Sequence, residues 1–287
     1  MEKFQKKFKA MKMELKEHKS SFFVYITLRT LVLLIMVLQI LNRNYENVFY
    51  CFLTLVMLTV PSILQMELKI ELPTTLEIII LIFIFAAEIL GEIGSYYTKF
   101  PYWDTMLHTL NGFLAAAIGF SLVDLLNTEN KKKFNLSPLY MAIVAFCFSM
   151  TIGVLWEFFE CAMDLFFGTD MQKDTIIHSI STIMLDPTGG THVYHINNIN
   201  DVIINGTSLG LGGYLDIGLL DTMMDLLVNF IGAFVFSVIG YFYVKHRGTG
   251  KFVRHFIPKK KKAEADFLRI VEEETKKKHN KQEHTTR

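Results

Sequence analysis

Long apolar runs alternate with short polar breaks along this chain, and the runs are long enough to cross a lipid bilayer. A membrane-spanning helix needs roughly 20 mostly apolar residues. The pattern predicts an all-α fold, a polytopic transmembrane helix bundle of about six spans. The expected spans are Phe22–Leu41, Val48–Gln65, Thr75–Tyr96, Tyr102–Leu126, Leu139–Phe167 and Leu219–Val244.

These spans divide the chain into a basic N-terminal segment (residues 1–21), a transmembrane domain (residues 22–244) and a charged tail (residues 245–287). One connection, Gly168–Gly218, is much longer than the others. Within it, the dipeptide Asn205-Gly206 lies between β-prone residues, and this predicts a short β-hairpin.

The basic residues are distributed very unevenly, although the formal net charge is only +1. If the N-terminus is cytoplasmic, the inner segments and tail hold 25 Lys and Arg, including Lys131, Lys132 and Lys133, and the outer segments hold three. Under the positive-inside rule this bias places both termini in the cytoplasm and the long connection outside. We therefore expect a multi-pass protein of the cell membrane, whose basic termini attract anionic lipid headgroups. We expect no nucleic-acid partner, because the charges of the tail alternate in sign in blocks.

The three cysteines, Cys51, Cys147 and Cys161, lie in apolar segments without metal-ligand spacing. Their pattern argues against a disulfide scaffold and against a thiolate metal site.

Several ionisable side chains fall inside the expected spans, where each costs a few kcal/mol and therefore calls for a partner or a function. Within each span they are three or four residues apart, so each set lies on one face of its helix. Helical rise places nearly all of them within roughly 3–15 Å of the outer boundary. Two further polar residues, Asn111 and Asp164, accompany them. The candidate site residues are Asp104, His108, Glu157, Glu160, Asp221, Asp225 and Asn229, with Glu88 and Glu92 as a neighbouring shell.

Such a group of carboxylates around one imidazole allows several chemistries. His108, Glu157, Glu160 and Asp225 could bind a divalent metal. Crowded carboxylates at low dielectric could instead act as general acid or base, or pass protons during transport. The structural alternative is that they only join the helices through hydrogen bonds and ion pairs.

The long connection also contains histidines, among them His178 and the pair His192-x-x-His195. The pair could contribute to a metal site if a third ligand approached it. The connection could also fold back over the polar site as a lid.

The order of these motifs resembles that of known families. Trp103-Asp104-x-x-x-His108, Trp156-Glu157-x-x-Glu160 and Asp221-x-x-x-Asp225-x-x-x-Asn229-x-x-Gly232 are similar to the bacterial YjdF-type membrane proteins. More distantly they resemble the VanZ-like family, which is associated with resistance to a glycopeptide antibiotic. The resemblance covers spans three to six and implies a polytopic bacterial membrane protein. The chain departs from the VanZ-like pattern at Glu160, where an amide is common, and in its long connection.

The sequence thus favours a membrane protein with an outward-facing Asp/Glu/His site that acts on a lipid or lipid-linked substrate of the cell envelope. One alternative is a proton- or cation-coupled transporter that uses the same carboxylates. The other is a structural or assembly protein whose buried acids only hold the helices together.

Overall fold

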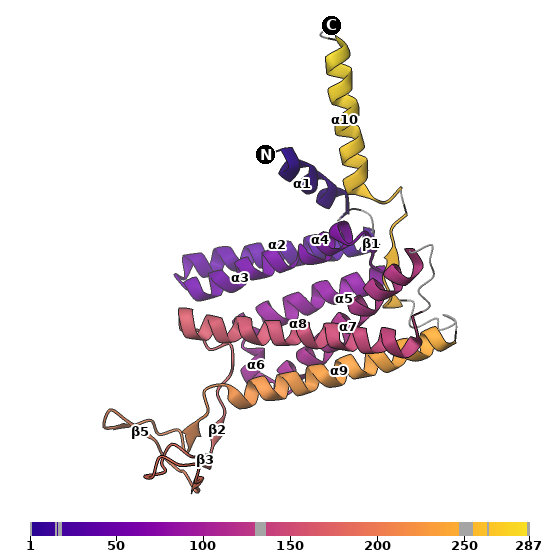
Figure 1. The fold of residues 1–287 in the computed structure, drawn as a ribbon. Coiled ribbons are helices and arrows are strands. Elements are labelled where there is room, and N and C mark those ends of the chain that lie inside the picture. Colours follow the sequence, from indigo (N-terminus) through magenta and orange to yellow (C-terminus); the bar gives the residue numbers. More distant parts are fainter. Residues whose placement is uncertain are drawn as a thin grey trace. The chain divides into compact units, whose positions relative to one another are not determined.

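The computed structural model describes residues 2–14, 16, 19–129, 136–246, 255–262 and 264–285. The segment around Lys131, Lys132 and Lys133, which is expected on the inner side, lies outside the described residues, as does the stretch 247–254 of the tail. The helices are α1 (Glu2–Glu14), α2 (Lys19–Leu41), α3 (Tyr45–Met57), α4 (Val60–Glu67), α5 (Thr74–Phe85), the π-helix η1 (Ala86–Ile93), α6 (Tyr96–Lys99), α7 (Trp103–Glu129), α8 (Pro138–Phe167), α9 (Leu219–Lys245) and α10 (Phe267–Thr285) (Figure 1). The strands are β1 (Ile70–Glu71), β2 (Ile176–Ile177), β3 (Ile180–Thr182), β4 (Tyr194–Ile196), β5 (Ile203–Ile204), β6 (Thr207–Ser208), β7 (Tyr214–Leu215) and β8 (Lys259–Lys260).

The predicted all-α membrane bundle is confirmed. Five helical segments in the described part of the chain are long and apolar enough to cross a membrane. They are Lys19–Leu41, Tyr45–Glu67, Trp103–Asp124, Pro138–Phe167 and Leu219–Lys245. Each coincides with one of the expected spans.

The remaining expected span, Thr75–Tyr96, consists of two helices of different type. α5 continues directly into the π-helix η1, where Gly94 N–H donates to Ile89 O, five residues earlier, at 2.9 Å. π-Helical turns are rare and occur frequently at functional sites. The expected span Val48–Gln65 is likewise divided, into α3 and α4, and Pro61 lies in the first turn of α4, where its missing N–H costs no helical hydrogen bond.

The chain divides into two compact units. Unit 1 comprises Met1–Met150 and Asn229–Arg287, and unit 2 comprises Thr151–Val228.

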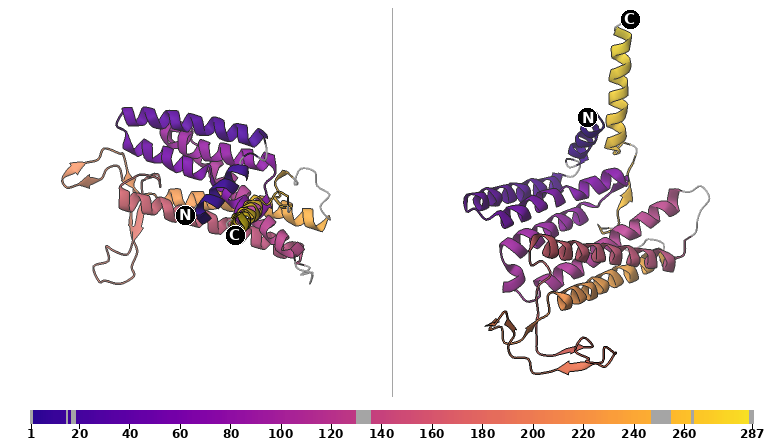
Figure 2. Two further views of the ribbon diagram at one scale, coloured as in Figure 1. Left: turned by 90° about the horizontal axis from the view of Figure 1, so that it is seen from above. Right: turned by 60° about the vertical axis from the view of Figure 1, so that its left-hand side comes forward.

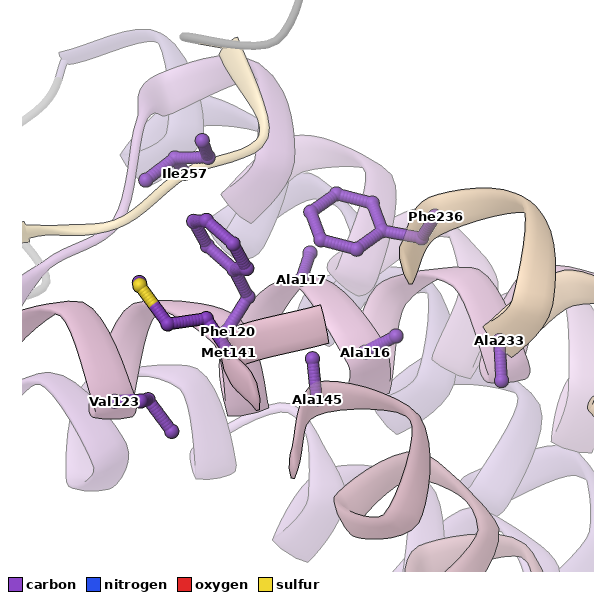
Figure 3. Packing of buried hydrophobic residues seen from close by; sticks show 9 residues of the cluster. All are labelled: Ala116, Ala117, Phe120, Val123, Met141, Ala145, Ala233, Phe236 and Ile257. Atoms are coloured by element: carbon purple, nitrogen blue, oxygen red, sulfur yellow. The ribbon is translucent and has the colours of Figure 1, made fainter. Parts of the chain in front are cut away.

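The main core of unit 1 lies between α7, the first half of α8, the second half of α9 and the segment that follows α9. Its largest side chains are Phe120 and Phe236, whose ring centroids are 6.1 Å apart. Ile257, from beyond α9, completes this cluster (Figure 3). Small alanines, such as Ala116 and Ala233, fill the remaining positions and allow the helices to approach closely.

The two terminal helices, α1 and α10, lie side by side at one end of unit 1 (Figure 2). The side chains of Lys9 and Glu274 form an ion pair of 2.7 Å between them. Lys261 forms a buried ion pair with Glu14. β8 pairs with β1, in the loop between α4 and α5, so the N-terminal helix, this loop and the C-terminal segment meet at the same end of unit 1.

The long connection, in unit 2, forms three small antiparallel ladders (Figure 1). β2 pairs with β7 and brings the two ends of the connection together, and β3 pairs with β4. β5 and β6 form the predicted hairpin at Asn205-Gly206. Both turn residues have positive φ, 51° and 81°, as a two-residue type I′ turn requires.

Candidate functional site

Asp104 and His108 form a pair on the first two turns of α7. The Nε2 atom of His108 lies 3.5 Å from the Oδ1 atom of Asp104, and the two side chains are 11% and 28% exposed. They are four positions apart, which places one above the other on the helix. Asp104 also lies in the first turn of α7, where a carboxylate is favoured by the helix dipole. The spacing argument from the sequence is confirmed for this pair.

One turn deeper, Asn111 of α7 joins Asn229 of α9. The Nδ2 atom of Asn111 donates to Oδ1 of Asn229 at 3.1 Å, and Asn229 is 1% exposed. The amide of Asn229 also lies 3.6 Å from the sulfur of Met150. The side chain of Asn229 therefore links α7 to α9 within unit 1. Its role in the polar site, expected from sequence, stays a prediction.

Glu88 and Glu92 lie on η1, and Glu88 is 3% exposed. Among the described residues, the Oε2 atom of Glu88 has no hydrogen-bond partner. A buried oxygen without a donor is costly, so such an atom in a native protein calls for an explanation.

An aromatic group lies where η1, α6 and α7 meet. The ring of Tyr96, on α6, lies 4.8 Å from Phe100 and 4.9 Å from Trp103, both edge to face. The indole nitrogen of Trp103 is buried, and it too has no hydrogen-bond partner among the described residues. From the sequence, Trp103 is identified only as part of a motif. A tryptophan beside Asp104, at the end of an apolar span, is itself typical of a residue at a membrane boundary.

In unit 2, Glu157 and Glu160 lie on the second half of α8 and are 5% and 8% exposed. Trp156 donates its Nε1–H to Oε1 of Glu160 at 2.8 Å. On α9, Asp225 is also buried, at 3% exposed. That the acids of all four helices lie at one level and share one site stays a prediction.

Three aspartates of unit 2 fasten the long connection to its own helices. Asp164 accepts the N–H groups of Met171 and Gln172 at 2.7 and 2.8 Å. Asp221 accepts the N–H of Lys173 at 2.8 Å. A carboxylate that accepts backbone N–H groups satisfies donors that would otherwise be unpaired. Asp221, expected in the polar site, thus has at least one structural task.

Asp216 is the third aspartate that attaches the long connection, and it is not among the candidate residues predicted from sequence. Its Oδ1 accepts the N–H of Thr175 at 2.7 Å and its Oδ2 that of Leu220 at 2.8 Å. Burial by itself would raise the pKa of this carboxyl, but the N–H donors of Thr175, Leu220 and Gly218 outweigh burial and hold its pKa below the usual value. The available signal was an aspartate three residues before an apolar run that begins at Leu219, which is typical of a helix start.

The neighbouring Asp174 is affected in the opposite direction. Burial, and then the charges of Asp170, Asp216 and Asp164, raise the pKa of Asp174 above its usual value. Negative charge is therefore concentrated where the connection leaves the helices.

The loop histidines make polar contacts within the described connection. No three His, Cys, Asp or Glu side chains of residues 168–218 lie close enough to share an ion. Instead, Nδ1 of His195 lies 2.9 Å from the hydroxyl of Ser181 across the β3–β4 ladder, and Nδ1 of His178 lies 3.0 Å from the carbonyl of Ile199. These contacts stabilise the connection itself.

Another buried carboxylate, Glu77 of α5, was not predicted from sequence either. It is 4% exposed and accepts a hydrogen bond from Nε2 of Gln65 at 3.3 Å. Oε1 of Gln65 in turn accepts the N–H of Leu72 at 2.9 Å. Glu77 lies in the first turn of its helix, where a sequence reading expects a solvated charge, so only the fold reveals its burial.

Comparison with known proteins gives one match. The model of a family described as "Predicted membrane protein (DUF2238)" matches residues 23–246. No curated protein and no solved structure matches the chain.

Proposed function

The chain belongs to the DUF2238 family of predicted membrane proteins, and from this premise we propose that it acts on a lipid or lipid-linked substrate of the cell envelope. The reaction would take place at a polar site in the outer half of the membrane, centred on His108. The observation that supports this is the Asp104–His108 pair, a carboxylate 3.5 Å from a mostly buried imidazole inside a spanning helix. A helix in contact with lipid does not retain such a pair without a partner or a function.

The chemistry of the pair follows from its geometry. A carboxylate beside one ring nitrogen can orient the imidazole and stabilise the imidazolium that forms when the ring accepts a proton, which suits a general base. With a divalent metal, His108 would be a ligand and Asp104 a second one. Unit 1 would then supply two donor atoms, fewer than the three protein ligands of a typical catalytic zinc site. The metal-binding prediction therefore depends on Glu157, Glu160 and Asp225, which the helical spacing assigns to the same site.

The proposal is tested with the purified full-length protein and its variants His108→Ala, Asp104→Asn and Glu157→Gln. Bound metals are measured by mass spectrometry. The protein is then incubated with a bacterial envelope lipid extract, and the lipids are compared before and after. The matched control is His195→Ala, which changes an exposed histidine of the connection.

A lipid change that wild type and His195→Ala produce, and His108→Ala does not, supports the proposal. Metal lost from both His108→Ala and Glu157→Gln supports the metal form of the site. Unchanged lipids, together with lower melting temperatures of His108→Ala and Asp104→Asn, would mean that the pair only stabilises the bundle.

Proton- or cation-coupled transport is the second candidate, and the buried carboxylate of Glu88 on a π-helix favours it. Proton-dependent uptake into liposomes that is lost in Glu88→Gln and Glu157→Gln would move this candidate to first place.

For the location we propose the cell membrane, with both termini cytoplasmic and basic enough to attract anionic lipid headgroups. The strong bias of Lys and Arg supports this orientation. So does the meeting of α1, α10 and the α4–α5 loop at one end of unit 1. A fluorescent-protein fusion after residue 287 should fluoresce, and a cysteine at Thr207 should react with a membrane-impermeant maleimide in whole cells. A dark fusion or an unreactive cysteine would reverse the orientation.

A further inference from the structure

We propose that the outer end of η1, α6 and α7 binds the hydroxyl-bearing headgroup, a sugar or another polyol, of a membrane lipid. This inference rests on the function proposed above and names the class of substrate for the same end of unit 1.

Two buried side-chain atoms at this end of unit 1 are complementary in hydrogen bonding. Oε2 of Glu88 is a buried acceptor and Nε1 of Trp103 is a buried donor, and neither has a partner among the described residues. Each such atom costs the protein free energy, and a bound molecule would recover it. The two atoms belong to different helices, so local backbone geometry does not explain both.

Both residues belong to the packed region where η1, α6 and α7 meet. η1 packs against α6 and α7. The ring of Tyr97 lies so close to Gly91 of η1 that a Cβ there would be 2.3 Å from it, and the ring of Tyr96 lies 4.9 Å from that of Trp103. α6 thereby connects the helix of Glu88 to the first turn of α7.

Charge and hydrogen-bonding capacity together indicate the class of headgroup. A hydroxyl group both donates and accepts, so a molecule with several hydroxyls can serve Glu88 and Trp103 at once. A phosphate fits less well, because it would lie near the acids Glu92 and Asp104, and Lys99, the cation of α6, already donates to the carbonyl of Gly94 at 2.8 Å. A quaternary ammonium has no N–H to donate to Glu88. Aromatic rings such as Tyr96 offer apolar faces and edges at the membrane boundary, against which a sugar ring can pack.

The experiment uses the two tryptophans of the chain, Trp103 and Trp156, as reporters. The full-length protein, labelled with ¹⁵N in the indole rings, is placed in phosphatidylcholine nanodiscs, whose headgroups carry no hydroxyl. Monoglucosyl-diacylglycerol is added in increasing proportion, and the two indole N–H signals are followed by NMR. Trp156, which already donates to Glu160, serves as the internal control. A Trp156→Phe sample assigns the signals.

We expect a saturable shift of the Trp103 signal and none of the Trp156 signal. Glu88→Leu should weaken the apparent affinity for the glycolipid by about tenfold, since a buried hydrogen bond to the headgroup is lost and its donor is left unpaired. Glu88→Gln, which retains an acceptor, should weaken it less. Glu77→Gln, which alters an equally buried carboxylate bonded to Gln65, should leave the affinity unchanged. In lipid without hydroxyls, Glu88→Leu should melt no lower than wild type, because it removes a buried polar atom that has no hydrogen-bond partner among the described residues.

Several results would overturn the inference. They are no Trp103 shift, a shift that Glu88→Leu leaves intact, or a Trp103 N–H that exchanges with water regardless of the glycolipid. A melting temperature clearly lowered by Glu88→Leu would mean that Glu88 only stabilises the bundle. Loss of the Trp103 response with an intact His108-dependent lipid change rejects the headgroup site alone. An intact Trp103 response without that lipid change rejects the proposed function alone.

Discussion

Asn111 and Asn229 meet where the backbones of α7 and α9 lie in close contact. Their amides are 3.1 Å apart, and the residues that follow them include two glycines, Gly112 on α7 and Gly232 on α9. A Cβ on Gly112 would lie 2.1 Å from the carbonyl oxygen of Asn229, and a Cβ on Gly232 would lie 1.9 Å from that of Thr109. The hydrogen bond and the close backbone approach therefore depend on each other.

Replacing either asparagine by leucine should destabilise the protein and should do so through their mutual bond. In membranes, such interhelical bonds contribute about 0.6 kcal/mol on average and up to about 1.7 kcal/mol. A double-mutant cycle of Asn111→Leu and Asn229→Leu, followed by unfolding in mixed micelles, should give a coupling energy in this range. A coupling near zero would show that the two amides do not stabilise the helix pair together.

Gly112→Ala and Gly232→Ala should be far more damaging than an ordinary Gly-to-Ala change in a helix. The new methyl group would overlap a backbone carbonyl, which cannot rotate away, so α7 and α9 must separate. Gly240→Ala on the same helix is the control, because there the nearest atoms, 3.0 Å away, belong to the ring of Phe120. We expect a large loss of melting temperature for the first two variants and a small change for the third. Similar melting temperatures for all three would contradict the close approach.

The buried ion pair of Lys261 and Glu14 should be much more important than the exposed pair of Lys9 and Glu274. The side chains of the first pair are 3% and 2% exposed, and those of the second 54% and 50%. Lys261→Met leaves a carboxylate buried without its cation, at a cost of about 3–5 kcal/mol, whereas exposed pairs contribute about 0–1 kcal/mol. Limited proteolysis should therefore release α10 rapidly from Lys261→Met and slowly from Lys9→Met. Adding Glu14→Leu to Lys261→Met should restore most of the resistance, and a failure to do so would argue against the pair.

Apolar length and helical spacing predicted the spans, the Asp104–His108 pair and the hairpin, because each depends on local sequence. The hydrogen bonds of a π-helix span five residues where those of an α-helix span four, and the apolar pattern of residues 74–93 contains no sign of that difference. The burial of Glu77 and the ion pair between Lys261 and Glu14 arise from contacts between segments that are distant in the sequence. Spacing along a single helix carries no information about such contacts. For the same reason, the spacing predicted a face for each acid but not its partner, as Asp221 and its bond to Lys173 show.

Asp216 should make the attachment of the long connection depend on pH. Its pKa is lowered in the folded protein, so its stabilising effect is present above the usual pKa of about 3.9 for an unfolded aspartate. The effect is lost as the pH falls through the lower, folded pKa. Hydrogen exchange of the N–H groups of Thr175 and Leu220, which Asp216 accepts, should therefore show constant protection near neutrality and less protection in acid, after correction for the intrinsic rate.

The variant Asp216→Asn should show weaker protection of these two N–H groups at neutral pH and little further loss in acid, because its amide cannot titrate. Asp174→Asn is the matched control. The pKa of Asp174 is raised by burial and by the neighbouring acids, so removing this charge should leave the protection at neutral pH unchanged or increase it. Equal effects of the two substitutions would mean that general negative charge, and not the acceptor role of Asp216, governs how the connection is held.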